Sequence, residues 1–281
     1  MTTRLQPQSQ MLTVNGLRVH YLDWGHAGAP PVVCVHGFTS SAQSFNTLAR
    51  HFAYRFHFLV PDVRGHGDSA WSPTAAYQFR DQVADLAAFV DQVGLEQFTL
   101  IGTSMGGRIA MAYAGEHSER LVRLVINDIG PDVEEGSQRI TQTASTRPEV
   151  FATLDDAIAY RRQVSLIRRS AADERECALG VLRQRPDGQW VWKMDPAYIR
   201  LQRQPGGRPR PVLWPVLEHV PCPTLVVWGM ESDILSEAQA RRMVAVLPQG
   251  ELVAVPGVGH APTLVEPVVL AALERFLSGL S

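Results

Sequence analysis

Short apolar runs alternate with amphipathic segments along most of the chain. The runs are four to eight residues long and rich in β-branched residues, which predicts buried strands at PPVVCVHG, FHFLV, FTLIG, LVRLVIND, PTLVVWG and ELVAV. Between them, apolar residues recur at helical spacing over residues 81–93, 236–247 and 265–278. Strands that alternate with helices predict an α/β fold, in which helices cover both faces of a mostly parallel sheet.

The chain opens differently, with two strand-like segments joined by a tight turn. MLTV and LRVHYLDWG are separated only by Asn15-Gly16. This dipeptide favours a two-residue turn between antiparallel strands. We therefore expect a hairpin at the start of the fold.

Residues 131–213 interrupt the alternation. Strand patterns are missing there, and 14 Lys and Arg residues stand against 8 Asp and Glu between residues 137 and 212. Pro205-Gly206-Gly207, followed by two more prolines, indicates a linker back to the sheet. Because a structureless loop of that length is uncommon in a compact domain, we predict a helical insertion at 131–213 in a core formed by 1–130 and 214–281.

The stretch FTLIGTSMGGRIAMAYA places Ser104 where a strand turns directly into a helix. Gly102 and Gly106 leave room for the sharp bend, and the free N–H groups at the start of the helix favour negative charge near the hydroxyl. A dinucleotide-binding loop would need a third glycine where Ser104 stands, and no Gly-Lys-Ser/Thr of a phosphate-binding loop follows. The G-x-S-x-G pattern instead predicts a nucleophilic serine.

A serine hydroxyl needs a base, and the base needs a carboxylate to orient it. His260 lies on a glycine-rich loop after a predicted strand, which makes it the candidate base. Two aspartates follow predicted strands, Asp233 and Asp128, and we favour Asp233 with Asp128 as the alternative. The oxyanion formed by the attack needs backbone donors, for which we predict the N–H groups of Met105 and Phe38.

The composition of the chain limits the classes of partner that the protein is expected to bind. The 281 residues carry a net charge of −2, which argues against a nucleic-acid-binding protein. Three widely spaced cysteines imply no disulfide framework, and no clustered ligand set predicts a metal or a cofactor. No apolar run is long enough for a membrane span and the first ten residues lack the core of a signal peptide, so we expect a cytoplasmic protein. Its oligomeric state stays open.

The motifs VHGF (35–38), DVRGHGDS (62–69), GTSMGG (102–107), WGMESD (228–233) and GVGH (257–260) resemble, in order and spacing, those of the α/β-hydrolase fold superfamily. The resemblance covers essentially the whole chain and implies an eight-stranded, mostly parallel sheet with a helical cap. It implies Ser104 as nucleophile, His260 as base, and Phe38 and Met105 as oxyanion donors, with no catalytic role for Arg64 or His66. Asp233 lies four residues after Gly229 rather than the family's usual three, so Asp128 stays open as the acid.

The expected activity is hydrolysis of a small-molecule carboxylic ester or lactone through an acyl-enzyme. Alternatives are a carbon–carbon bond hydrolase acting on a β-diketone-type substrate, a cofactor-free haloperoxidase, or a ligand receptor with an idle triad. Trp190, Trp192 and Tyr160 are candidates for binding substrate. The arginine-rich runs of the insertion fit either a solvated surface or an anionic substrate, and we favour the surface because the whole chain has 25 arginines and one lysine.

Overall fold

Eight strands form one sheet, in the order β1-β2-β4-β3-β5-β6-β10-β11. The computed structural model describes residues 5–132, 136–165, 167–203 and 211–279. The strands are Gln8–Val14 (β1), Leu17–Trp24 (β2), Pro31–Val35 (β3), His57–Pro61 (β4), Phe98–Thr103 (β5), Leu121–Asn127 (β6), Thr224–Gly229 (β10) and Gly250–Val255 (β11). β2 pairs antiparallel with β1 and with β4, and all other neighbours are parallel. The predicted α/β fold and its opening hairpin are confirmed.

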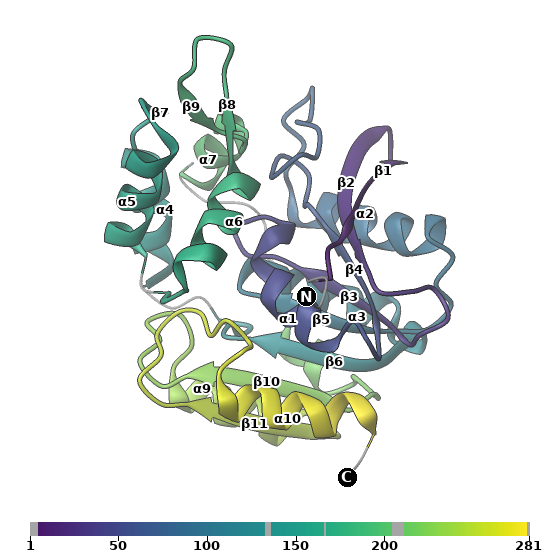
Figure 1. Ribbon diagram of the computed structural model, residues 1–281. Helices are drawn as coiled ribbons and strands as arrows, with labels where there is room; N and C mark the ends of the chain where they lie inside the picture. The colour runs from purple at the N-terminus through teal and green to yellow at the C-terminus, as the bar shows by residue number, and fades with distance from the viewer. Residues whose placement is uncertain (1–4, 133–135, 166, 204–210, 280–281) are drawn as a thin grey trace.

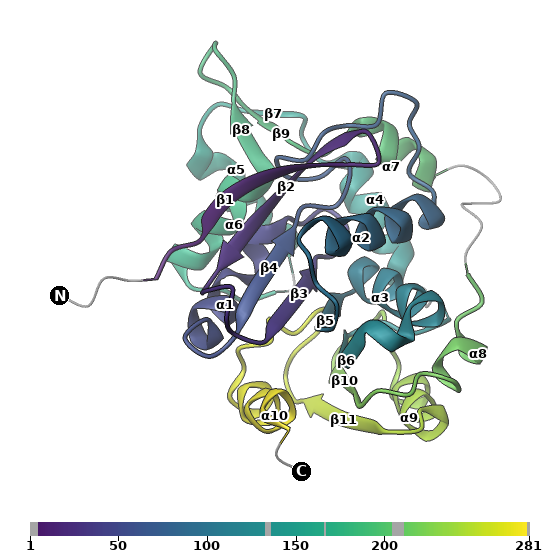
Figure 2. The same ribbon diagram turned by 90° about the vertical axis from the view of Figure 1, so that its right-hand side faces the viewer.

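Helices cover both faces of this sheet (Figures 1 and 2). Successive strand residues point to opposite faces, so Leu100 and Ile101 of β5 belong to two separate cores. One core includes α1 (Asn46–Phe52) and α10 (Pro267–Ser278). The other includes α2 (Phe79–Gln92), α3 (Met105–Glu116), α8 (Trp214–Leu217) and α9 (Glu237–Val246). None of the described helices is long and apolar enough to cross a lipid bilayer.

The insertion contains both helices and a small sheet. Its helices are α4 (Gly136–Thr146), α5 (Leu154–Val164), α6 (Ala171–Val181) and α7 (Pro196–Gln202). Three strands, β7 (Val150–Phe151), β8 (Leu182–Gln184) and β9 (Trp190–Trp192), pair antiparallel in the order β7-β9-β8. A helical insertion was expected from the sequence, which shows no strand pattern there; the small sheet went unpredicted because strands of two or three residues are too short to produce a period. The linker predicted around Pro205 lies mostly outside the described residues.

Polar contacts fasten the insertion to the core. Glu176 on α6 accepts hydrogen bonds from Asn46 and Arg50 on α1. On the other side of the site, the Lys193 ammonium lies 2.8 Å from Asp68, and Trp71 donates its indole N–H to the Lys193 carbonyl. The insertion is thereby held over the carboxyl ends of the parallel strands, where loops carrying functional residues gather in such sheets.

Candidate active site

Ser104 stands at the predicted bend between β5 and α3. Its backbone has φ 53° and ψ −118°, a conformation that few residues other than glycine adopt. The neighbouring glycines are needed because backbones meet there: a Cβ on Gly106 would lie 2.0 Å from the Val35 carbonyl oxygen, and one on Gly102 would lie 2.4 Å from the Gly106 carbonyl oxygen. The sequence thus forces a tight turn, and the Ser104 side chain lines a pocket above it.

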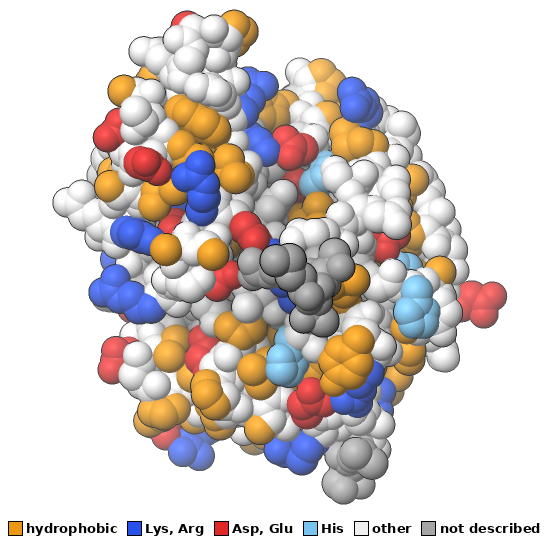
Figure 3. Space-filling model, in the orientation of Figure 1, with side chains coloured by type: hydrophobic (Ala, Val, Ile, Leu, Met, Phe, Trp, Pro, Cys, Tyr) orange, Lys and Arg blue, Asp and Glu red, His pale blue; other side chains and the backbone are white. Residues whose placement is uncertain are grey.

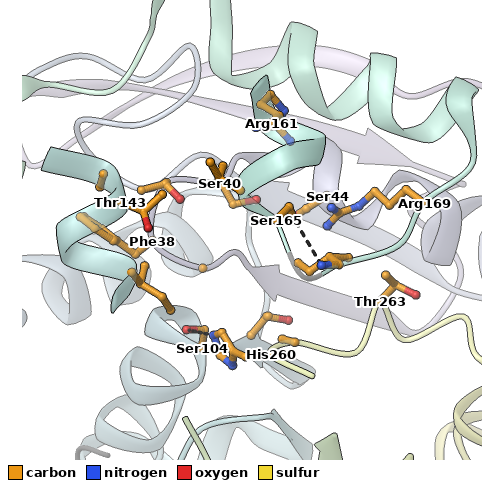
Figure 4. A pocket seen from close by; sticks show the side chains of 18 of the residues that line it. Phe38, Ser40, Ser44, Ser104, Thr143, Arg161, Ser165, Arg169, His260 and Thr263 are labelled. Atoms are coloured by element: carbon orange, nitrogen blue, oxygen red, sulfur yellow. Dashed lines mark hydrogen bonds between the residues drawn. The ribbon is translucent and has the colours of Figure 1, made fainter. Parts of the chain in front are cut away.

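The structure brings Ser104 and His260 together although 156 positions separate them in the chain. The Ser104 Oγ lies 2.9 Å from the His260 Nε2, and the other ring nitrogen, Nδ1, lies 2.8 Å from the Asp128 Oδ2 (Figure 4 shows the first pair). An ionised carboxylate only accepts hydrogen bonds, so Nδ1 carries a proton and Nε2 is free to accept the serine proton. This is the hydrogen-bond chain that a serine nucleophile requires.

Asp128 is fixed from several sides. It follows β6, is fully buried, and has a positive φ of 53°. Its carboxylate accepts hydrogen bonds from the Gly229 N–H at 2.8 Å and from the Ser232 hydroxyl at 2.6 Å, besides its contact with His260. These donors compensate the burial of its charge and hold one oxygen against the imidazole.

Asp233, which the sequence analysis favoured as the partner of His260, is held elsewhere. Its carboxylate accepts two hydrogen bonds from Arg139 on α4, at 2.7 and 2.9 Å, and is partly exposed. The hydrogen bond from Arg139 lowers the pKa of Asp233 below its ordinary value. The preference is corrected in favour of the alternative, since the structure pairs His260 with Asp128 and ties Asp233 to the insertion.

Phe38 and Met105 flank the serine, one after β3 and one at the start of α3. Among the described residues, no protein acceptor takes the backbone N–H of either one. Tyr198 on α7 contacts both side chains: its ring lies 5.5 Å from the Phe38 ring between centroids, and its hydroxyl lies 3.1 Å from the Met105 sulfur. A residue of the insertion therefore braces the two segments that were predicted to supply the oxyanion donors.

A cavity of about 220 Å³ opens beside Ser104 and His260 (Figure 4). The core provides one wall, from the loops after β3, β5 and β11, and the insertion provides the other, from α4, α5 and the following loop. Of the three predicted substrate-binding aromatics, Tyr160 and Trp192 line the cavity. Trp190 is not among the lining residues, although all three aromatics pack against the small core of the insertion.

Four arginines of the insertion also line this cavity: Arg139, Arg147, Arg161 and Arg169. The sequence analysis favoured a solvated surface for the arginine-rich runs. That holds for Arg162 and Arg168, which are exposed, but not for Arg161 and Arg169 of the same run, which line the cavity. Arg139 and Arg147 lie outside the runs. The excess of Lys and Arg over Asp and Glu in the insertion was the signal in the sequence for a basic cavity. A run of arginines, however, does not show which of them face inward.

The charged residues and the histidine of the motif DVRGHGDS make contacts that stabilise the fold. Arg64 makes a paired ion contact with Asp85 at 2.6 Å, and His66 is buried among aromatic rings, where burial lowers its pKa to about 3. Within the described part of the chain, one group could present ligands to a metal ion: His20, Asp62 and Asp68. The Asp62 carboxylate already accepts hydrogen bonds from the Ala42 and Asp68 N–H groups, which leaves it satisfied without an ion.

Residues 30–267 match the family model described as alpha/beta hydrolase fold. The chain belongs to this family. It is 31% identical to a 3-hydroxybutyrate-oligomer hydrolase of Cupriavidus necator over 96% of each chain. It is also 28% identical to the Escherichia coli esterase YbfF, over 88% of this chain and 93% of that one.

A solved structure of similar shape supports the same assignment. The crystal structure of an alpha/beta hydrolase from Novosphingobium aromaticivorans superimposes with a TM-score of 0.87 at 33% identity, covering 98% of this chain and 99% of the other. The α/β-hydrolase fold that the five sequence motifs implied is confirmed, and the family and its relatives identify the protein as a hydrolase.

Proposed function

We propose that this hydrolase cleaves a carboxylic ester or lactone with Ser104 as nucleophile, His260 as base and Asp128 as the residue that orients the base. The observation that carries the proposal is the continuous hydrogen-bond chain from the Ser104 Oγ through His260 to Asp128, at 2.9 and 2.8 Å. The esterase and the oligomer hydrolase among its relatives support ester chemistry.

The reaction follows from this chain in two halves. The Ser104 Oγ attacks the carbonyl carbon while its proton passes to the His260 Nε2, and the imidazolium that forms is stabilised by Asp128. The bond from the carbonyl carbon to the alcohol oxygen then breaks, and that oxygen takes the proton from Nε2. Water repeats the sequence on the acyl-enzyme: its proton passes to Nε2, its oxygen bonds to the carbonyl carbon, and the Ser104 Oγ leaves with that proton.

The oxyanion of each tetrahedral intermediate is proposed to accept hydrogen bonds from the Phe38 and Met105 N–H groups. Both lie beside Ser104 and have no protein acceptor among the described residues. Met105 is the first residue of α3, so the helix dipole adds to the stabilisation of negative charge there. Each such donor typically contributes about 3 kcal/mol to the transition state.

The direct test is a substrate panel assayed with the wild type and Ser104→Ala. We expect hydrolysis of 4-nitrophenyl butyrate or of an aliphatic lactone by the wild type, and a loss of at least about 10³-fold in kcat for Ser104→Ala. A β-diketone in the same panel tests carbon–carbon cleavage. Turnover of the diketone alone, or ester turnover that survives Ser104→Ala in a folded protein, would overturn the proposal.

A further inference from the structure

The cavity beside Ser104 has a strongly basic wall. The four arginines named above line it, and no Asp or Glu is among its described lining residues. In Figure 4, Arg161 and Arg169 reach in from the insertion, across the cavity from Ser104 and His260. The outer face of the insertion differs, because there basic and acidic side chains lie beside one another (Figure 3). The space next to the nucleophile thus faces four basic side chains and no acidic one among the described lining residues.

Carboxylates behind the wall neutralise part of this charge. Arg139 is paired with Asp233, and Arg161 donates to Glu174 at 2.7 Å. Arg169 lies 3.8 Å from that same Glu174. Two carboxylates, Asp233 and Glu174, therefore neutralise three of the four guanidinium groups only in part.

Arg147 has no carboxylate partner in the described part of the chain. Its guanidinium lies over the Trp192 ring, 4.2 Å from the ring centroid. Among the described residues no acceptor takes the N–H donors of this group. Burial, together with the nearby Arg161, lowers the pKa of Arg147 to about 10, so the group keeps its charge at neutral pH. A half-buried cation that keeps its charge and its donors, in the wall of a cavity, is complementary to a planar anion.

We infer that the substrate carries a carboxylate, which Arg147 binds with its free N–H donors while the scissile carbonyl lies at Ser104. The cluster formed by Arg147, Arg161 and Arg169 adds attraction at longer range, because only one of its three charges is fully paired. This inference rests on the proposed function and specifies its substrate class: an ester that also bears a free acid group.

The test compares esters that differ only in that charge. One pair, mono-4-nitrophenyl adipate and 4-nitrophenyl adipamate, places the acid on the acyl side. A second pair, 4-carboxyphenyl butyrate and 4-carbamoylphenyl butyrate, places it on the alcohol side. We expect the wild type to prefer the acid over the amide by about 10- to 100-fold in kcat/KM in at least one pair, as a charge-assisted hydrogen bond would give.

Variants assign the preference to a residue. Arg147→Leu should abolish it, bringing kcat/KM for the acid and for the amide of that pair to within about threefold of each other, and Arg147→Lys should restore part of it by returning the charge. Arg162→Leu is the control, because Arg162 also belongs to the insertion, on α5, but is exposed and lies outside the cavity lining. It should keep the full preference.

Adipate provides a readout that needs no variant. It should inhibit hydrolysis of neutral 4-nitrophenyl butyrate competitively, and adipamide should inhibit much less. Equal turnover of acid and amide in both pairs, or a preference that survives in folded Arg147→Leu, would overturn the inference while leaving ester hydrolysis intact. Failure to hydrolyse any of the esters would instead reject the proposed function.

Discussion

At the residue scale, the chemistry depends on how a single buried carboxylate is held. Asp128 accepts hydrogen bonds from a backbone N–H, a hydroxyl and the imidazole of His260, and it has no exposed surface. An amide in its place would keep the shape but could present an N–H to Nδ1. The imidazole would then protonate at Nε2 and lose its ability to accept the serine proton.

Asp128→Asn is therefore expected to lower kcat by about 10³- to 10⁴-fold. Asp233→Asn, which only weakens a partly exposed pair with Arg139, should stay within about threefold of the wild type. Steady-state kinetics on 4-nitrophenyl butyrate, with circular dichroism as a folding control, checks both. A larger loss for Asp233→Asn would show that the carboxylate paired with Arg139 is the one that serves His260.

The burial of His66 leads to a second prediction, on how the free energy of unfolding depends on pH. Burial lowers its pKa to about 3, against about 6.5 in an unfolded chain. Between these values the unfolded chain binds a proton that the folded protein does not bind. The free energy of unfolding should thus fall as pH falls from about 6.5 toward 3, by up to about 1.4 kcal/mol per pH unit from this group.

Urea unfolding of the wild type and His66→Asn over this pH range measures that contribution. The variant should show a shallower fall in unfolding free energy below neutral pH. His26→Gln serves as control, because His26 is exposed, and it should follow the wild-type curve. Identical pH slopes for the wild type and His66→Asn would contradict the assignment.

At the scale of elements, the junction of β5 and α3 depends on backbone contact. The Gly106 Cα faces the end of β3, and an added Cβ would lie 2.0 Å from the Val35 carbonyl oxygen, which cannot move without disturbing the sheet. The bend at Ser104 thus depends on the close packing of β3, β5 and α3.

Gly106→Ala is expected to destabilise the protein by more than about 3 kcal/mol, or to prevent soluble folding. Gly28→Ala is the matched control: its Cβ would meet its nearest neighbour at 3.6 Å, an ordinary contact. It should change the free energy of unfolding by less than about 1 kcal/mol, measured by urea denaturation. Equal stabilities of the two variants would refute the close approach.

The elements differ in how readily the sequence reveals them. The continuous apolar run FTLIG is long enough to predict a buried strand, the stripe that begins at Val83 has a helical period, and the structure has a strand and a helix there. The strands β7, β8 and β9 have two or three residues and carry none. Asp128 and Asp233 both follow strands, and β6 and β10 are neighbours, so only three-dimensional contacts with His260 and Arg139 could separate them.

At the scale of the molecule, the insertion and the core form the site jointly. Tyr198 on α7 is fully buried, and its ring packs against Phe38, His66 and Tyr77 of the core. Its hydroxyl reaches the Met105 sulfur at 3.1 Å. Because Tyr198 contacts the side chains of both proposed oxyanion residues, the position of the insertion and the geometry of those residues are coupled.

Tyr198→Leu should therefore lower kcat by about tenfold or more with a smaller change in KM, since a small displacement of the donors weakens binding of the transition state above all. Trp190→Leu is the comparison, because Trp190 lies in the insertion but outside the cavity. It should leave kcat within about threefold. A loss confined to KM in Tyr198→Leu would indicate that Tyr198 only shapes the pocket.

The proposed role of Ser104 can be measured directly by covalent labelling. A fluorophosphonate should modify the folded wild type once per chain, and peptide mapping by mass spectrometry should place the adduct on Ser104. His260→Ala should slow this labelling strongly, because the serine loses its base. Stoichiometric labelling of another residue, or none in a folded and active protein, would contradict the account.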